Sequence, residues 1–138
     1  KVIVLDSHGS VLLSLFNLPT LGNLRPKNLI VYVFDNEVYS GSRISYPTAT
    51  AGNTGLEAMA RGAGIKKALT IRDVETFKKN GLGALEQNEL AFIVCKVEES
   101  LMHREIPRPT TDLAENKYTF VRYLERTEGK PFPFIGRG

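Results

Sequence analysis

Apolar residues in this chain gather in short continuous runs that are separated by polar turns. Such runs are typical of parallel strands with both faces covered, so we predict four strands, the first of them buried like the others. These strands comprise residues 2–6, 29–34, 67–71 and 90–97. The single cysteine, Cys95, falls in the last run and is expected to be a buried strand residue rather than a nucleophile.

Between the strands, apolar residues recur at the spacing of helices. The first helix is predicted over residues 10–22, where Pro19 either kinks the helix or ends it early. The second helix is short, because Thr54 and Glu57 form a capping box and Gly64 ends it. Its apolar stripe comprises Leu56, Met59, Ala60 and Ala63.

A third helix is predicted from residue 73 onward. Residues 98–111 form a polar connector that contains proline, and residues 112–127 form a C-terminal helix that Asp112 can cap. Residues 131–134 cannot be helical or lie in a central strand, so we expect them to cover a surface or a partner chain.

The alternation of strands and helices predicts an α/β fold: a three-layer, open, mostly parallel sheet with helices on both faces and right-handed crossovers. With 138 residues, of which 42% are apolar, we expect a single domain over residues 1–138. Residues 38–52 show no periodicity, and a loop of that length in a compact domain is usually functional. The chain starts at Lys1 with residues that already predict a core strand, so we expect the domain to lack its N-terminal portion.

Charge and hydropathy argue against two classes of partner. The formal net charge is +3 and the basic residues are scattered, so we expect no nucleic-acid partner. No apolar run approaches the length of a membrane span and no signal peptide is visible, so we expect no membrane partner. A single cysteine fits a reducing compartment, and we expect a cytoplasmic protein.

Two polar clusters follow the first and second predicted strands. Residues 6–10, Asp-Ser-His-Gly-Ser, form a turn into the first helix, where backbone N–H groups can hold a phosphate. Asp35 and Asn36 follow the second strand and offer an amide oxygen and loop carbonyls, which suit Mg²⁺ or Ca²⁺. Because parallel strands all end at the same edge of a sheet, we expect both clusters to belong to one site.

This order of motifs resembles the diphosphate-binding domain of thiamine diphosphate-dependent enzymes. A strand, an Asp-x-x-Gly-Ser turn, an apolar helix, an Asn-Leu-Ile-Val strand, an Asp-Asn pair and a tyrosine follow one another within residues 2–97. Within that family, the chain is most similar to subunits of sulfopyruvate and phosphonopyruvate decarboxylases. The resemblance implies thiamine diphosphate and Mg²⁺ as cofactors and a 2-oxoacid as substrate.

The resemblance also implies which residues form the site, although it assigns no catalytic residue to this chain. The implied cofactor-binding residues are Ser7, His8, Gly9, Ser10 and Tyr39, and the implied metal ligands are the Asn36 side chain, the Val38 main-chain carbonyl and His8.

His8 departs from the family pattern, which has Gly-Asp-Gly where this chain has Ser-His-Gly. An imidazole replaces the carboxylate that ligates Mg²⁺, and Mg²⁺ takes histidine poorly, whereas Mn²⁺, Co²⁺, Ni²⁺ or Zn²⁺ accept it. Four interpretations stay open: a ligand of another metal, a direct contact to the diphosphate, a loss of cofactor binding, or an ordinary capping or solvent-facing turn residue. Asp6 cannot replace the missing carboxylate, because the pleat of the strand sets the direction of its side chain.

The resemblance places the family's cofactor-activating glutamate on a separate pyrimidine-binding domain. We expect that domain on missing residues or on another polypeptide, in a homodimer or a heteromer. The leading hypothesis is the diphosphate-binding part of a 2-oxoacid decarboxylase, and the alternative is a degenerate, non-catalytic protein of the same fold with an interaction or regulatory role. A flavodoxin-like or receiver-like phosphate-binding domain is a third hypothesis. Arg43 could contact an anionic group of the substrate, and we assign no role to His103.

Overall fold

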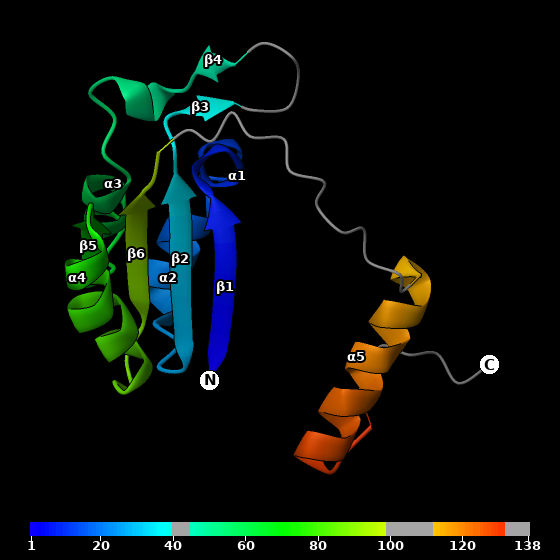
Figure 1. Ribbon diagram of the computed structural model, residues 1–138. Coiled ribbons are helices and arrows are strands. Elements are labelled where there is room, and N and C mark those ends of the chain that lie inside the picture. Colours follow the sequence, from blue (N-terminus) through cyan, green and yellow to red (C-terminus); the bar gives the residue numbers. More distant parts are fainter. Residues whose placement is uncertain (40–44, 99–111, 132–138) are drawn as a thin grey trace. The chain divides into compact units, whose positions relative to one another are not determined.

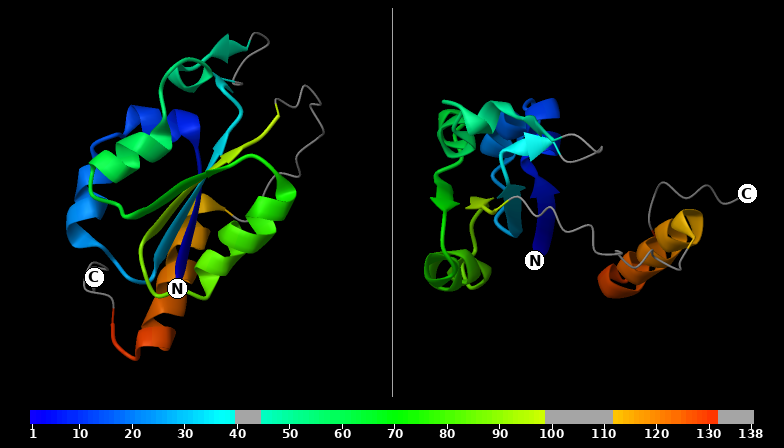
Figure 2. Two further views of the ribbon diagram at one scale, coloured as in Figure 1. Left: turned by 90° about the vertical axis from the view of Figure 1, so that its left-hand side faces the viewer. Right: turned by 45° about the horizontal axis from the view of Figure 1, so that its top comes forward.

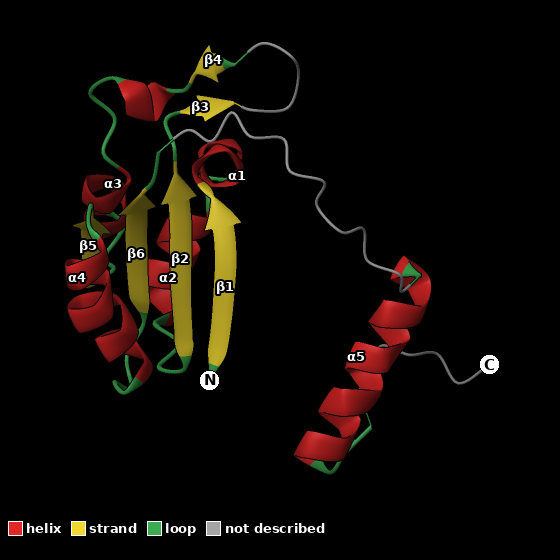
Figure 3. Ribbon diagram, in the orientation of Figure 1, coloured by secondary structure: helices red, strands yellow, loops and turns green. Residues whose placement is uncertain are grey.

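The computed structural model describes residues 1–39, 45–98 and 112–131. The chain forms two compact units, Lys1–Ser100 and Leu101–Gly138. The first unit is built on a parallel sheet in the strand order β1-β2-β6-β5, drawn as yellow arrows in Figure 3. Its strands are β1 (Val2–Ser7), β2 (Leu29–Asp35), β5 (Lys67–Ile71) and β6 (Ala91–Lys96). The prediction of an open, parallel α/β sheet is confirmed.

Helices cover both faces of this sheet, so the unit has three layers (Figure 2). On one face, α1 (His8–Leu13), α2 (Asn17–Leu24) and α3 (Leu56–Gly62) pack on β2 and β6. On the other face, a helical segment packs on residues of β2, β5 and β6 through Phe77, Ala84 and Leu85. That segment consists of α4 (Val74–Thr76), a π-helical turn (Phe77–Gly81) and a 3-10 turn (Leu82–Leu85). The apolar runs of β2 and β6 are therefore buried on both sides, as a covered parallel sheet requires.

The first strand differs from the prediction that it is buried. Within the described residues, β1 pairs only with β2 and lies at the edge of the sheet. Its side chains are largely exposed, with Leu5 at 70% and Val2 at 51%. An apolar run predicts burial only where the sheet continues on both sides, and β1 has a neighbour on one side.

The first predicted helix is in fact two helices, α1 and α2, with a break at residues 14–16. Pro19 lies in the first turn of α2, where its missing N–H leaves no intrahelical hydrogen bond unmade. The prediction that Pro19 kinks or ends a single helix was therefore wrong.

The second predicted helix is α3, and its start also differs from the prediction. Gly55 is its N-cap and no side chain caps it, so Thr54 and Glu57 form no capping box. The Glu57 carboxylate accepts a hydrogen bond from Arg61 Nε at 3.0 Å instead. Its end was predicted correctly, since Gly64 takes the left-handed conformation with a φ of 94°.

The segment predicted as an irregular loop, residues 38–52, contains short regular elements. Strands β3 (Val38–Tyr39) and β4 (Tyr46–Pro47) pair antiparallel, and a 3-10 turn (Ala49–Ala51) follows them. Both strands lie beyond the carboxyl end of β2 in Figure 1. Strands of two residues are too short to show periodicity in a sequence.

In the second unit, the structure describes α5 (Leu113–Glu128), which agrees with the predicted C-terminal helix. Asp112 caps α5, because its carboxylate accepts hydrogen bonds from the backbone N–H groups of Ala114 and Glu115. Most of the predicted connector, and residues 132–134 of the tail, lie outside the described residues. In the part of the chain that is described, no helix is both long and apolar enough to cross a bilayer.

Candidate functional site

The carboxyl ends of β1 and β2 open into a cavity of about 500 Å³. The turn after β1 and the turn after β2 both line it, as expected from two parallel strands that end at one edge. All seven residues that the resemblance implies as cofactor or metal ligands line this cavity: Ser7, His8, Gly9, Ser10, Asn36, Val38 and Tyr39. In Figure 1 this region lies where α1 meets the start of β3.

Ser7 begins the helix that forms one wall of the cavity. It is the N-cap of α1, and its hydroxyl accepts a hydrogen bond from the backbone N–H of Ser10 at 3.3 Å. His8 is the first residue of α1 and is only 4% exposed. The interpretation of His8 as a capping or solvent-facing residue was therefore wrong.

The His8 ring is held through its Nδ1 atom. Nδ1 lies 3.3 Å from the carbonyl oxygen of Phe34 and 3.8 Å from Asp35 Oδ1. Both neighbours are acceptors, so we assign a proton to Nδ1. Nε2 is buried and has no hydrogen-bond partner among the described residues. A buried ring nitrogen without a partner is unusual, and it leaves one acceptor lone pair unsatisfied.

Gly9 lies against the ring of Tyr39. A Cβ atom at Gly9 would come within 2.8 Å of Tyr39 Cε1, so the absence of a side chain lets the tyrosine lie against the start of α1. The Tyr39 and His8 rings are also neighbours, with centroids 6.3 Å apart. Gly9, His8 and Tyr39 thus form one side of the cavity.

The turn after β2 forms the opposite side of the cavity. Glu37 takes the left-handed conformation with a φ of 67°, which is strained for a residue with a side chain. Its backbone N–H donates to Asp35 Oδ1 at 3.0 Å, which holds the turn in place. Thr48 N–H donates to the Glu37 carbonyl at 2.8 Å. Val38 and Pro47 therefore face each other as a non-hydrogen-bonded pair, and Pro47 donates no hydrogen bond to the Val38 carbonyl. This carbonyl and the Asn36 amide are oxygen ligands of the kind that hard cations prefer.

Beneath the turn lies a buried ion-pair network that the sequence did not predict. Asp35 is 1% exposed, and its carboxylate accepts from Lys96 Nζ at 2.9 Å and from the Thr50 hydroxyl at 2.8 Å. Lys96 also pairs with Glu37 at 2.6 Å. Lys96 ends an apolar strand, and only the β2–β6 register, which places it opposite Asp35, reveals the pairing.

These contacts shift the pKa values of the pair in opposite directions. Burial alone would raise the pKa of Asp35, but hydrogen bonds from Lys96, Thr50 and a backbone N–H, with the Lys96 charge, hold it below its ordinary value. Burial would lower the pKa of Lys96, but its bonds to Glu37 and Asp35 and their charges raise it overall. Both groups are therefore charged near neutral pH.

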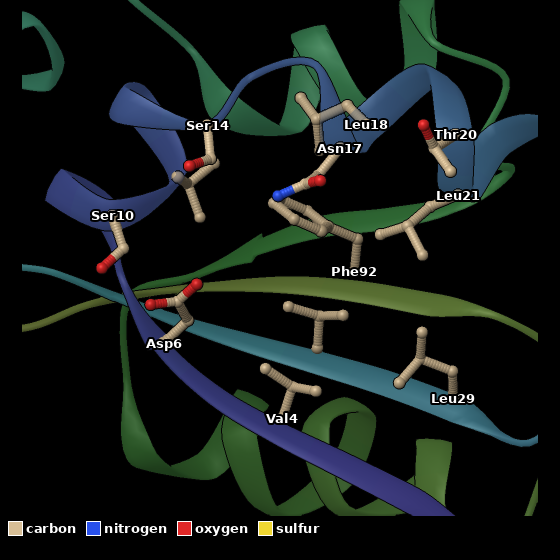
Figure 4. A pocket seen from close by; sticks show the side chains of 12 residues that line it. Val4, Asp6, Ser10, Ser14, Asn17, Leu18, Thr20, Leu21, Leu29 and Phe92 are labelled. Atoms are coloured by element: carbon tan, nitrogen blue, oxygen red, sulfur yellow. The ribbon is translucent and has the colours of Figure 1, made fainter. Parts of the chain in front are cut away.

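Asp6 belongs to a different hollow, of about 320 Å³, between β1 and the α1–α2 segment. Figure 4 shows the Asp6 side chain turned into this hollow, which Val4 and Phe92 also line. Asp6 does not line the cavity of His8 and Asn36, as expected from the alternation of side chains along β1. It cannot supply the carboxylate that His8 replaces.

Cys95 does not line the cavity. Cys95 is buried, and burial raises the pKa of its thiol, which agrees with a structural residue. Arg43 and His103 lie outside the described residues. Within the described ranges, no three residues of the types His, Cys, Asp and Glu cluster as metal ligands, so a metal here would need amide and carbonyl oxygens beside His8.

Comparison with known proteins gives two curated relatives with the same name. Over 130 residues the chain is 35% identical to sulfopyruvate decarboxylase subunit beta of Methanocaldococcus jannaschii, and over 129 residues it is 26% identical to that of Methanococcus maripaludis. These matches take in 92% and 91% of this chain, which spans 65% of the length of each relative. No protein-family model matches the chain. The similarity to sulfopyruvate decarboxylase subunits that the motifs indicated is confirmed.

Proposed function

We propose that this chain is the diphosphate-binding part of a thiamine diphosphate-dependent 2-oxoacid decarboxylase of the sulfopyruvate or phosphonopyruvate type. The observation that carries the proposal is the meeting of the turns after β1 and β2 in one cavity. The similarity to two relatives named sulfopyruvate decarboxylase subunit beta also supports the proposal.

In this proposal, the start of α1 holds the diphosphate. The first N–H groups of a helix have no partner within the helix and can donate to an anion. In α1 the Ser10 N–H donates to the Ser7 hydroxyl, so the N–H groups of His8 and Gly9 would bind the diphosphate. The absence of a side chain at Gly9 lets the Tyr39 ring lie against the start of α1, where it would cover one side of the bound group. Asn36, the Val38 carbonyl and His8 would hold a divalent metal against the diphosphate.

When bound, thiamine diphosphate supplies the carbanion that attacks the keto carbon of a 2-oxoacid and accepts the electrons as CO₂ leaves. The residues of this chain bind and orient the cofactor through its diphosphate. The buried pair of Asp35 and Lys96 keeps the Glu37 turn, and with it Asn36 and Val38, in a fixed position.

The proposal includes a second polypeptide or further residues that carry a pyrimidine-binding domain. Both relatives are named as beta subunits, which supports a partner subunit. The substrate would then bind between the two parts, in a homodimer or a heteromer.

The alternative is a degenerate, non-catalytic protein of the same fold with an interaction or regulatory role. It is favoured by one observation, the histidine at the position where the family has a carboxylate ligand. The two candidates differ in what the complete assembly does with a substrate.

The test is release of CO₂ from sulfopyruvate by the protein purified with its partner subunit, supplied with thiamine diphosphate and Mg²⁺, Mn²⁺ or Co²⁺ in separate reactions. We expect turnover with at least one metal and a loss of turnover without thiamine diphosphate. Binding of the cofactor without turnover of sulfopyruvate, phosphonopyruvate or pyruvate would favour the non-catalytic alternative.

A further inference from the structure

His8 lines the cavity of the proposed metal site, and its buried Nε2 atom has no hydrogen-bond partner among the described residues. We assign a proton to Nδ1, because its two neighbours, the Phe34 carbonyl at 3.3 Å and Asp35 Oδ1 at 3.8 Å, are acceptors. Nε2 is left as a bare acceptor in a side chain that is 4% exposed. An acceptor needs either a hydrogen-bond donor or a cation.

A neutral ring with its proton on Nδ1 has no proton at Nε2 to donate to the diphosphate. The diphosphate oxygens are acceptors, and in that form they would face the Nε2 lone pair with no proton between them. A cation satisfies the lone pair directly. Metal-binding histidines show the same arrangement, in which one ring nitrogen donates to a carbonyl or a carboxylate and the other binds the metal.

The nitrogen also discriminates among cations. Mg²⁺ demands oxygen ligands and releases its water reluctantly, whereas first-row transition metals accept imidazole beside oxygen ligands. The other proposed ligands, the Asn36 amide and the Val38 carbonyl, are both oxygens, so the set would be mixed nitrogen and oxygen.

We infer that His8 converts this site from Mg²⁺ to a divalent transition metal, such as Co²⁺ or Mn²⁺, bound through Nε2 together with the diphosphate. This inference rests on the proposed function, since the diphosphate supplies the remaining ligands. It selects one of the interpretations of His8 that the sequence left open.

The test is a calorimetric titration of the protein, with its partner subunit, by thiamine diphosphate in Mg²⁺ or in Co²⁺. We expect the affinity of the wild type for thiamine diphosphate to be higher in Co²⁺ than in Mg²⁺ by a factor of about ten or more. In the His8→Asp variant, which restores the carboxylate, we expect this preference to disappear. The matched control is His103→Asn, which changes the other histidine of the chain and should keep the preference.

Visible absorption of bound Co²⁺ and NMR of the imidazole nitrogens give readouts that need no activity. With Co²⁺ and thiamine diphosphate, we expect absorption bands that the His8→Asp variant changes and the His103→Asn control does not. With Zn²⁺, the Nε2 resonance of His8 should shift while Nδ1 stays protonated. The NMR measurement uses the wild type alone, so it decides the question even if His8→Asp does not fold.

Three results would contradict the inference. Equal affinity of the wild type in Mg²⁺ and Co²⁺ would overturn the metal change and leave the proposed function standing. Binding in Mg²⁺ by His8→Asp alone would also overturn it and would favour the degenerate alternative. No binding of thiamine diphosphate by the wild type or by a folded His8→Asp variant, with any metal, would overturn the proposed function and the inference together.

Discussion

Asp35 is the residue on which the geometry of the site depends. One oxygen of its carboxylate accepts from Thr50 and from the backbone N–H of Glu37, and the other pairs with Lys96. The strained Glu37 turn costs on the order of 1–2 kcal/mol, and the hydrogen bond that the Glu37 N–H donates to Asp35 offsets part of that cost. A buried carboxylate with three partners therefore supports the half-buried turn residues Asn36 and Val38, which would bind the ligand.

We predict that Asp35→Asn lowers the free energy of unfolding at pH 7 by about 3 kcal/mol, because it leaves Lys96 without its buried counter-ion. The folded-state pKa of Asp35 lies below the ordinary value of 3.8. The contribution of Asp35 to the free energy of unfolding is therefore present above that value and is lost as the pH falls through the folded-state pKa. The measurement is the free energy of unfolding in urea, for the wild type and for Asp35→Asn, at pH values from 7 down to 3 or below.

The difference between the wild type and Asp35→Asn should narrow as the pH falls, because acid protonates the wild-type carboxylate. Asp6→Asn is the control, since Asp6 has no ion pair in the part of the chain that is described. A difference that stays constant down to the lowest pH would contradict the role given to Asp35.

Gly9 and His8 show how close contact and burial turn an ordinary strand-to-helix turn into a candidate site. The sequence predicted the turn and its neighbours, but the contact of Gly9 with Tyr39 comes from a segment thirty residues later in the chain. The burial of His8 likewise depends on Phe34 and Asp35.

At the scale of elements, α1 and α2 are two helices because the chain changes direction between them. Residues 14–16 redirect the chain, and α2 then approaches α3 so closely that Gly22 lies against the backbone of Ala63. A hydrophobic pattern alone predicts one continuous helix, since it contains no information on where the backbone must approach another helix.

We predict that Gly22→Ala destabilises the fold by about 3 kcal/mol, because overpacking against backbone cannot be relieved by a rotamer change. A Cβ at Gly22 would lie 1.8 Å from the Ala63 carbonyl oxygen, so α2 and α3 would have to separate. The measurement is the free energy of unfolding in urea.

Gly62→Ala is the matched control for Gly22→Ala. Gly62 is helical, and a Cβ there meets no atom within 4 Å. It should leave stability unchanged or raise it by about 0.5–1 kcal/mol. Equal effects of the two substitutions would contradict the close approach of α2 and α3.

At the scale of the whole molecule, the sequence was sufficient to predict the parallel sheet and to predict that the ends of two strands lie together. Both follow from local patterns, namely the apolar runs and the polar residues that end them. The exposure of β1 and the pairing of Lys96 with Asp35 depend on which strands are neighbours, and a periodic pattern does not contain that order.

The capping of α3 shows a further limit of prediction from the sequence. Thr54 and Glu57 have the spacing of a capping box, yet Gly55 is the N-cap of the helix and Glu57 pairs with Arg61. A cap depends on backbone angles at a single residue, and the same residues allow starts one position apart.

The central claim is that the cavity at the ends of β1 and β2 binds the diphosphate of thiamine diphosphate. Its most direct test is calorimetric titration of the protein, with its partner subunit, by thiamine diphosphate and by thiamine, each with a divalent metal. Asn36→Ala removes a proposed metal ligand, and Asn53→Ala, which does not line this cavity, is the control. We predict saturable binding of thiamine diphosphate but not of thiamine, weakened about tenfold or more by Asn36→Ala and unchanged by Asn53→Ala. Absence of thiamine diphosphate binding with every metal, or equal binding by Asn36→Ala and the wild type, would contradict the claim.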